Sequence, residues 1–388
     1  MFRVLMSFWP LFFGLGMIGF NIGMQNSLLG IRASMENFSI MSTGLMMSGY
    51  FAGYFAGAIY IPNIIAKVGH IRTFGAFGSV TSMVILIHAY FVDPFVWTLM
   101  RFISGVSMMA IFLVAESWLN ADSSNNIRGT VLSLYVMVLY AGYGSSQFCL
   151  NLGNPAESEL FVMISIVASL SMIPMLLKQT HTPCFSVVDK IKIVELYKIS
   201  PLGVLGNLFN NVINSMLLAM GAVFASQIGL SLSDISLFMA AMLFSGVLFL
   251  WPIGKLSDLV DRRIIIFACA LLGAVCAVIG ALYCHTNSAL LFVIIALLGG
   301  FCLPIYSLCL AHMNDSLSPE QFVSAGATMS LVAGVGLVSG PFLTALFLRV
   351  LGSQGFFWGI TAPCGVLTLF TAWRICRYPP VSIATTLE

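Results

Sequence analysis

The chain has 388 residues, of which 59% are hydrophobic and only 8% are charged, and its formal net charge is +2. A soluble domain carries roughly 25% charged residues, so this composition excludes an ordinary water-soluble globule. The small net charge gives no indication of a nucleic-acid partner. We therefore expect a membrane protein with many spans that transports, senses or acts within a bilayer.

The few charges fall in short clusters that separate apolar runs of about 20 residues, the length that a helix needs to cross a hydrocarbon core. These runs are continuous rather than alternating, which favours helices over a β-barrel. The first run begins almost at Met1 and no small-residue cleavage site follows it, so we expect a retained span. The predicted spans are 7–29, 41–65, 73–92, 95–117, 129–150, 159–177, 200–225, 234–251, 263–284, 289–312, 321–347 and 355–376.

The positions of lysine and arginine predict the orientation of these spans. With the N-terminus inside, thirteen of the sixteen basic residues fall on the cytoplasmic side. The other three, Arg32, Arg101 and Arg349, lie on the outer side or in span starts next to it. We therefore expect both termini to be cytoplasmic, in a bacterial-type inner membrane.

The longest polar stretch between spans, at about 178–199, divides the spans six and six. Charges alternate with apolar residues within it, which predicts a short helix on the inner membrane surface. The predicted units are an N-terminal six-helix bundle at 1–178, a cytoplasmic linker at 179–199 and a C-terminal six-helix bundle at 200–388. The remaining connections are short and leave no room for a receptor ectodomain.

The two halves repeat each other at several positions. Gly57 and Gly254 both lie where the second span of a half meets the inner loop. Glu116 and His312 both end a fourth span. A duplicated unit with both copies in the same orientation is typical of carriers in which two bundles rock about a central site.

The sharpest local motif is Gly254-Lys-Leu-Ser-Asp258-Leu-Val-Asp261-Arg262-Arg263. We expect Asp258 to pair with a cation from a neighbouring span and form a latch that breaks when the inner side opens. The motif resembles the loop signature of the major facilitator superfamily, G-x-L-x-D-x-x-x-R-[RK]. The resemblance implies an all-α membrane fold of about twelve transmembrane helices in two pseudo-symmetric six-helix bundles.

The first half departs from this signature, because Ile61 stands where the superfamily has an aspartate. Pro62 and the run Gly69-His-Ile-Arg72 follow it. Together with Glu116-Ser-Trp118-Leu-Asn120 and Ala311-His312-Met-Asn314-Asp315, this form is similar to the YcaD-like branch of transporters.

Charged residues near the inner ends of the spans are candidates for gating or coupling. An ionised Glu116 near hydrocarbon requires a partner, and we expect Arg128, with Lys67 or Arg72 as a further partner. A static anchor, a gate and a proton-coupling site are the alternatives for Glu116. His312 beside Asp315 could titrate near neutral pH or simply cap the surface. The full set is Glu116, Arg128, Lys67, Arg72, Asp258, Arg262, Arg263, His312 and Asp315.

Polar residues inside the spans are candidates for the substrate-binding cavity. Four asparagines share one face of the seventh span, where they either line a cavity or hold helices together. Arg101, deep in the fourth span, either bonds to backbone carbonyls or contacts an anion or the substrate. The candidates are Asn21, Gln25, Tyr140, Tyr143, Gln147, Asn207, Asn210, Asn211, Asn214 and Arg101. These amides and phenols suit a neutral or zwitterionic solute.

The function predicted from these features is secondary active transport of a small organic solute by alternating access. Proton coupling is what the family resemblance implies, and we expect a monomer in the lipid bilayer. The alternatives are an efflux antiporter rather than an importer, and a membrane sensor on the same fold that does not transport. The nine cysteines lack the spacing of a metal site or a disulfide framework. No nucleotide-binding loop is present, so neither a cofactor nor an enzymatic activity is expected.

Overall fold

The computed structural model describes residues 2–122, 128–177, 191–283, 288–318 and 321–377, and these form helices and short connections without a β-strand. Six long helices make up the N-terminal half, and their bounds lie close to the predicted spans. They are α1 (Phe2–Met35), α2 (Ile40–Val68), α3 (His70–Tyr90), α4 (Pro94–Asp122), α5 (Arg128–Cys149) and α6 (Glu159–Leu177). A single residue, Gly69, connects α2 to α3 at φ +91°, a backbone conformation that favours glycine.

The C-terminal half follows the short helix α7 (Ile193–Ile199). Its helices are α8 (Pro201–Gln227), α9 (Leu232–Leu259), α10 (Arg262–Tyr283), α11 (Ser288–Cys302), α12 (Ile305–Asn314), α13 (Phe322–Leu351) and α14 (Gly355–Arg377). The sequence predicts one continuous span at 289–312, whereas the structure breaks it between α11 and α12. Pro304 lies at this break, where its missing N–H and its ring interrupt the helical ladder.

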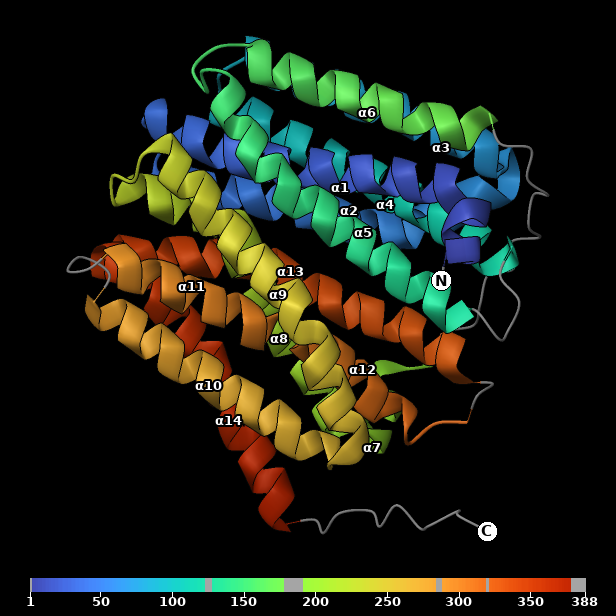
Figure 1. Ribbon diagram of the computed structural model, residues 1–388, viewed down its shortest axis with the longest axis vertical. Coiled ribbons are helices and arrows are strands. Elements are labelled where there is room, and N and C mark those ends of the chain that lie inside the picture. Colours follow the sequence, from blue (N-terminus) through green and yellow to red (C-terminus); the bar gives the residue numbers. More distant parts are fainter. Residues whose placement is uncertain (1, 123–127, 178–190, 284–287, 319–320, 378–388) are drawn as a thin grey trace.

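Among the described residues, eight segments are long and apolar enough to cross a membrane, and the last of them, Ser324–Arg377, contains both α13 and α14. The helices form two bundles that repeat the same packing. In the first bundle α1 packs on α5, α2 on α4 and α3 on α6. In the second, α8 packs on α13, α9 on α11 and α10 on α14. The two bundles lie one above the other in Figure 1. The predicted fold of two pseudo-symmetric six-helix bundles is thereby confirmed.

Glycines allow the helices within a bundle to approach closely. A side chain at Gly53 of α2 would overlap the backbone of Phe102 in α4, and one at Gly105 of α4 would overlap the backbone of Tyr50 in α2. Gly336 of α13, in the run Gly336-Leu-Val-Ser-Gly340-Pro341, lies likewise against the backbone of α8. These close contacts pack the helices of each bundle tightly against one another.

The apolar core is not the same at the two ends of the molecule. We call the end of the molecule at which α1 begins and α14 ends the terminal face, and the other end the opposite face. The largest buried cluster includes Leu29 of α1 and Val223 of α8, so it continues across both bundles near the opposite face. Smaller, separate clusters fill the C-terminal bundle nearer the terminal face, and one of them buries Leu196 of α7.

Candidate functional site

Arg101 lies on α4 and is fully buried. Its Nη2 atom donates a hydrogen bond of 2.7 Å to the Asn26 side-chain oxygen, and its guanidinium lies 4.4 Å from the centre of the Tyr50 ring. The partner is thus an amide side chain rather than the backbone carbonyls that the sequence offers as one alternative. Within the described part of the chain, its Nε and Nη1 atoms have no hydrogen-bond partner.

A hydrogen-bonded chain runs from Arg101 across to the other bundle. The Asn26 amide donates to the Tyr143 hydroxyl at 2.8 Å, and that hydroxyl donates to the Leu218 carbonyl of α8 at 3.3 Å. The predicted cavity residue Tyr143 therefore joins the two bundles directly.

Two further contacts join α9 to the end of α5 and the turn that follows it, near the opposite face. The Asn151 amide donates to the Ser236 hydroxyl at 3.2 Å. Beside it, the rings of Phe148 and Phe244 stack with centroids 6.4 Å apart. We call the residues of these two contacts, together with Tyr143 and Leu218, the seal.

The other polar candidates of the first bundle connect its own helices. Asn21 donates to the Ile164 carbonyl of α6 at 3.0 Å. Gln25 accepts a hydrogen bond of 3.3 Å from Ser104 of α4. Gln147 accepts a hydrogen bond of 2.6 Å from Ser27 of α1. The side chains of Asn21, Gln25 and Gln147 are all buried inside the bundle.

The asparagines at the start of α8 also bond to protein groups. Asn207 is fully buried and donates to the Met329 carbonyl of α13 at 2.8 Å. Asn211, one turn further along, donates to the Asn207 side-chain oxygen at 2.9 Å. This pair ties α8 to α13, as expected of the alternative in which asparagines hold helices together.

Asn210 occupies the break between α11 and α12. In the amide orientation that matches donors with acceptors, it donates to the Cys302 carbonyl at 2.8 Å and accepts from the Tyr306 backbone N–H at 3.1 Å. These are backbone groups on either side of the break, so the amide bridges the interrupted helical ladder. It also accepts from the Asn214 amide at 3.1 Å. The Asn214 side-chain oxygen is buried and has no partner among the described residues.

Glu116 is hydrogen-bonded to one tyrosine of its own bundle and lies within electrostatic range of others from both bundles. The Tyr135 hydroxyl of α5 donates to its carboxylate at 3.0 Å. Tyr54 of α2 and Tyr306 of α12 lie within electrostatic range of the same carboxylate, and Tyr140 lies within range of Tyr306. The Glu116, Tyr54 and Tyr140 side chains are partly exposed, and Tyr306 is 39% exposed.

Tyr54, Tyr135 and Tyr306 are absent from the candidates predicted from the sequence. A single tyrosine in an apolar helix gives no signal of its own, and only the folded structure brings these three within electrostatic range of Glu116. The sequence offers one indication of this site: Glu116 and His312 occupy equivalent positions at the ends of the two fourth spans. That repeat points to the same level of both bundles.

The expected cationic partners of Glu116 are not found beside it among the described side chains. Arg128 begins α5, but its side chain lies outside the described part of the chain. Lys67 and Arg72 are exposed, and within the described ranges neither forms an ion pair. Ile61, which replaces the superfamily aspartate, is fully buried.

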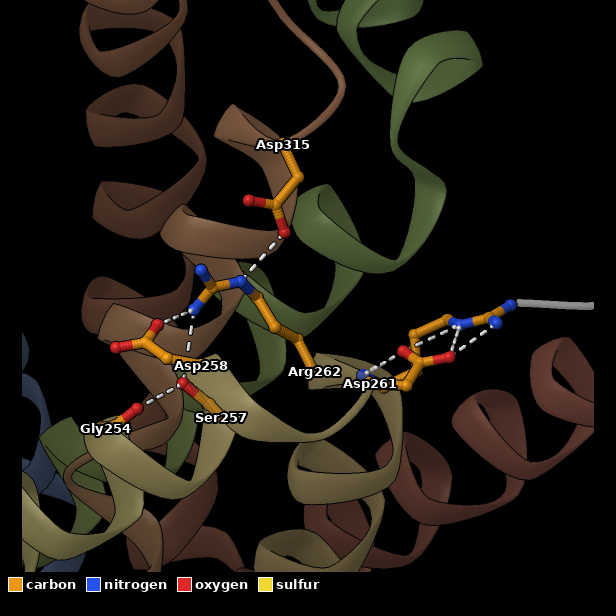
Figure 2. A network of polar contacts seen from close by, with 7 residues as sticks. Gly254, Ser257, Asp258, Asp261, Arg262 and Asp315 are labelled. Atoms are coloured by element: carbon orange, nitrogen blue, oxygen red, sulfur yellow. Dashed lines mark hydrogen bonds and ion pairs between the residues drawn. The ribbon is translucent and has the colours of Figure 1, made fainter. Parts of the chain in front are cut away.

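The charged loop between α9 and α10 forms the network in Figure 2. Arg262 contacts the Asp258 carboxylate at 3.1 Å and the Asp315 carboxylate at 2.8 Å. It also donates to the Ser257 hydroxyl at 3.1 Å. All of these partners belong to the C-terminal bundle, so the network clamps the ends of α9, α10 and α12 within that bundle.

A second pair lies next to this network. Arg263 contacts the Asp261 carboxylate at 2.6 Å, and its hydrogen bonds lower the pKa of Asp261 below the usual value. His312 is partly buried and lies within electrostatic range of both Asp261 and Asp315. The loop and the end of α12 therefore bring five predicted gate residues into one charged cluster: Asp258, Arg262, Arg263, His312 and Asp315.

A pocket of about 380 Å³ opens at the opposite face between the ends of α1, α2 and α8. Its lining includes Asn37, Phe38, Thr43 and Gln227. None of the predicted cavity residues lines it. It is therefore separate from both the Arg101 network and the Glu116 cluster.

Comparisons with known proteins show similarity to one family of transporters. The family model described as Major Facilitator Superfamily matches residues 203–387. The chain is 25% identical over 346 residues to the uncharacterized MFS-type transporter YcaD of Escherichia fergusonii, a match that covers 87% of both chains. Over its C-terminal half the chain is therefore similar to the major facilitator superfamily, and over most of its length it is similar to YcaD-like transporters.

Solved structures agree with this superfamily fold. A mutant of the nucleoside transporter NupG superposes with a TM-score of 0.78 at 13% identity, covering 94% of this chain and 99% of that one. A D-xylose-proton symporter superposes with a TM-score of 0.76 at 14% identity, covering 94% and 97%. At these identities the similarity establishes the fold and leaves the substrate open.

Proposed function

We propose that this chain is a secondary active transporter that moves a small organic solute by alternating access, as a monomer and with coupling to protons. Similarity to the superfamily supports transport rather than catalysis. The proposed location is a bacterial-type inner membrane with both termini cytoplasmic, because thirteen of sixteen basic residues then lie on that side.

The difference between the two faces is the observation that carries this proposal. Near the opposite face the bundles share the seal and one continuous apolar core. Near the terminal face, the hydrogen bonds and ion pairs of the described residues stay within one bundle or join the segment before α8 to the C-terminal bundle. This pattern is expected of a carrier closed on one side and free to part on the other, which in the proposed orientation is the inward-facing state.

Buried polar atoms without partners are groups whose hydrogen bonds a solute could complete. Two nitrogens of Arg101 and the side-chain oxygens of Asn21 and Asn214 are buried without a hydrogen bond among the described residues. Leaving such a group unpaired costs about 1–3 kcal/mol, and a bound solute can supply the missing partner. We therefore keep the predicted cavity residues as candidate contacts, with Arg101 and Asn214 first.

A thermal-shift screen of the purified protein against metabolites, chelates and drugs, at two pH values, would test this function. Each stabilising compound would then be followed in proteoliposomes with and without an imposed proton gradient. We expect at least one compound to cross faster than in protein-free liposomes, with a rate that depends on the gradient. A compound that binds but never crosses would contradict transport and favour a sensor on the same fold.

The direction of transport follows from the same assay. If the solute moves in the same direction as the protons, the protein is a symporting importer. If the solute moves in the direction opposite to the protons, the protein is an efflux antiporter. Charge-neutral variants of the predicted gate residues Glu116 and His312 test coupling, because loss of gradient dependence with binding intact would identify the proton carrier.

A further inference from the structure

Arg101 is a buried positive charge without a negative partner. Its side chain is fully buried, and an arginine guanidinium is always charged in proteins. Among the described residues Arg101 forms no ion pair, and its polar contacts are the neutral Asn26 amide and the face of the Tyr50 ring. Asp93, the acidic residue nearest to it in the sequence, is exposed and caps the start of α4. A charge removed from water is costly unless an opposite charge compensates it.

The guanidinium of Arg101 also keeps unused hydrogen-bonding capacity. An arginine side chain has five N–H donors in a planar fork, a geometry that matches the oxygens of an oxyanion. The Nη2 atom donates to Asn26, but the Nε and Nη1 atoms are buried and have no partner in the described part of the chain. A single bound oxyanion would supply both the missing charge and the missing acceptors.

This group lies next to the contact between the two bundles. The Asn26 side chain that accepts from Arg101 also donates to the Tyr143 hydroxyl at 2.8 Å. That hydroxyl donates in turn to the Leu218 carbonyl of α8 at 3.3 Å. Separation of the bundles at the opposite face would break this second bond. A ligand held by Arg101 would therefore lie beside a contact that alternating access makes and breaks.

Asn214 adds a complementary group from the C-terminal bundle. It lies one turn before Leu218 on the same side of α8, about 6 Å along the axis. Its amide nitrogen donates to Asn210 at 3.1 Å, whereas its side-chain oxygen is buried without a partner among the described residues. An N–H or O–H group of a solute could donate to this oxygen.

We propose that the transported solute is a small organic acid whose carboxylate pairs with Arg101 and whose amino or hydroxyl group donates to Asn214. This inference rests on the proposed transport function and adds the class of substrate. One guanidinium balances the single charge of a carboxylate, whereas a phosphate ester carries nearly two negative charges. The solute expected from the sequence is thereby narrowed: a zwitterionic acid meets the requirement, and a solute without a negative charge does not.

The test uses two pairs of probes. L-lactate is compared with L-lactamide, and L-alanine with L-alaninamide, because each amide keeps the shape of its acid and lacks the negative charge. Binding of each probe to the purified full-length protein is measured at neutral pH by calorimetry and by thermal shift. We expect at least one acid to bind and its amide to bind at least about tenfold more weakly, the factor that corresponds to about 1.4 kcal/mol.

Variants locate the binding. Arg101→Gln is expected to weaken binding of the acid at least about tenfold, and Arg101→Lys to weaken it less, because the charge remains. The matched control Arg349→Gln removes an exposed arginine in the last turn of α13 and should leave binding unchanged.

A second pair of variants tests the C-terminal bundle. Asn214→Ala is expected to weaken binding of the acid, whereas Gln227→Ala, which removes an exposed amide at the end of the same helix, should not. This pair keeps the test decisive even where the Arg101 variants do not fold.

The outcomes separate this inference from the transport function. No binding of either acid, equal binding of an acid and its amide, or acid binding indifferent to Arg101→Gln and Asn214→Ala would overturn the carboxylate site. Transport of a neutral or cationic compound would then still support the carrier. Acid binding that needs Arg101, without any flux of that acid in proteoliposomes, would support the site and contradict the transport function.

Discussion

Removal of the Tyr143 hydroxyl should shift the conformational balance of the carrier toward opening at the opposite face. That hydroxyl makes two hydrogen bonds, but only the one to Leu218 crosses between the bundles. The bond from Asn26 lies within the first bundle, so its loss in Tyr143→Phe affects both conformations alike and cancels from their equilibrium.

The magnitude follows from the bond that does not cancel. A hydrogen bond contributes about 0.5–1.5 kcal/mol net, and the length of 3.3 Å to Leu218 places this one toward the weak end. We expect a change of about 0.5–1 kcal/mol, which alters the ratio of the two conformations about two- to fivefold.

Spin-label distances across the opposite face measure this ratio directly. The control is Ser145→Ala, because the Ser145 hydroxyl bonds only to Gly142 of its own helix and its loss should leave the ratio unchanged. The assignment of Tyr143 to the seal would be refuted if the Tyr143→Phe variant had the same ratio of conformations as the unmodified protein. A ratio shifted toward closure of the opposite face would also refute it.

Three further predictions follow from the packing and the charges. Asn151→Ala, which removes the second hydrogen bond of the seal, should shift the same spin-label distances, and its effect should add to that of the tyrosine variant. Gly53→Ala should lower the free energy of unfolding by about 1–3 kcal/mol through overpacking, whereas Gly254→Ala, with open space around it, should not. Equal unfolding temperatures of the two variants would contradict the packing described for Gly53. Arg263 lowers the pKa of Asp261, so this pair stabilises the fold above about pH 4 and loses that effect as the pH falls further. Asp261→Asn should therefore make the free energy of unfolding depend less on pH in this acid range. An unchanged dependence would contradict the pairing.

The helices could be predicted from the sequence because hydrocarbon imposes a length and an apolar composition on each span. The predicted range 159–177 coincides with α6, and 355–376 ends one residue before α14 does. The break between α11 and α12 was missed, because the apolar run continues through Pro304 and hydropathy alone does not register it. The role of Asn210 depends on that break and could not be foreseen without it.

The sequence predicted where polar side chains lie within the spans, but only the structure shows their hydrogen-bond partners. The asparagine face of α8 is buried as expected, yet its first members bond to α13 and to the helix break. Glu116 could be selected from its charge in an apolar span. Tyr306, which lies within electrostatic range of it, is 190 residues away in the sequence, and only the three-dimensional structure reveals that relation.

The central claim is that the two bundles part alternately at the two faces. Two spin-label pairs test it most directly in a cysteine-free background: Lys67 with Leu259 at the terminal face, and Glu157 with Val350 at the opposite face, all at exposed positions. Addition of a transported compound or a change of pH is expected to move the two distances in opposite directions. Distances that stay fixed, or that lengthen together, would contradict alternating access in this protein.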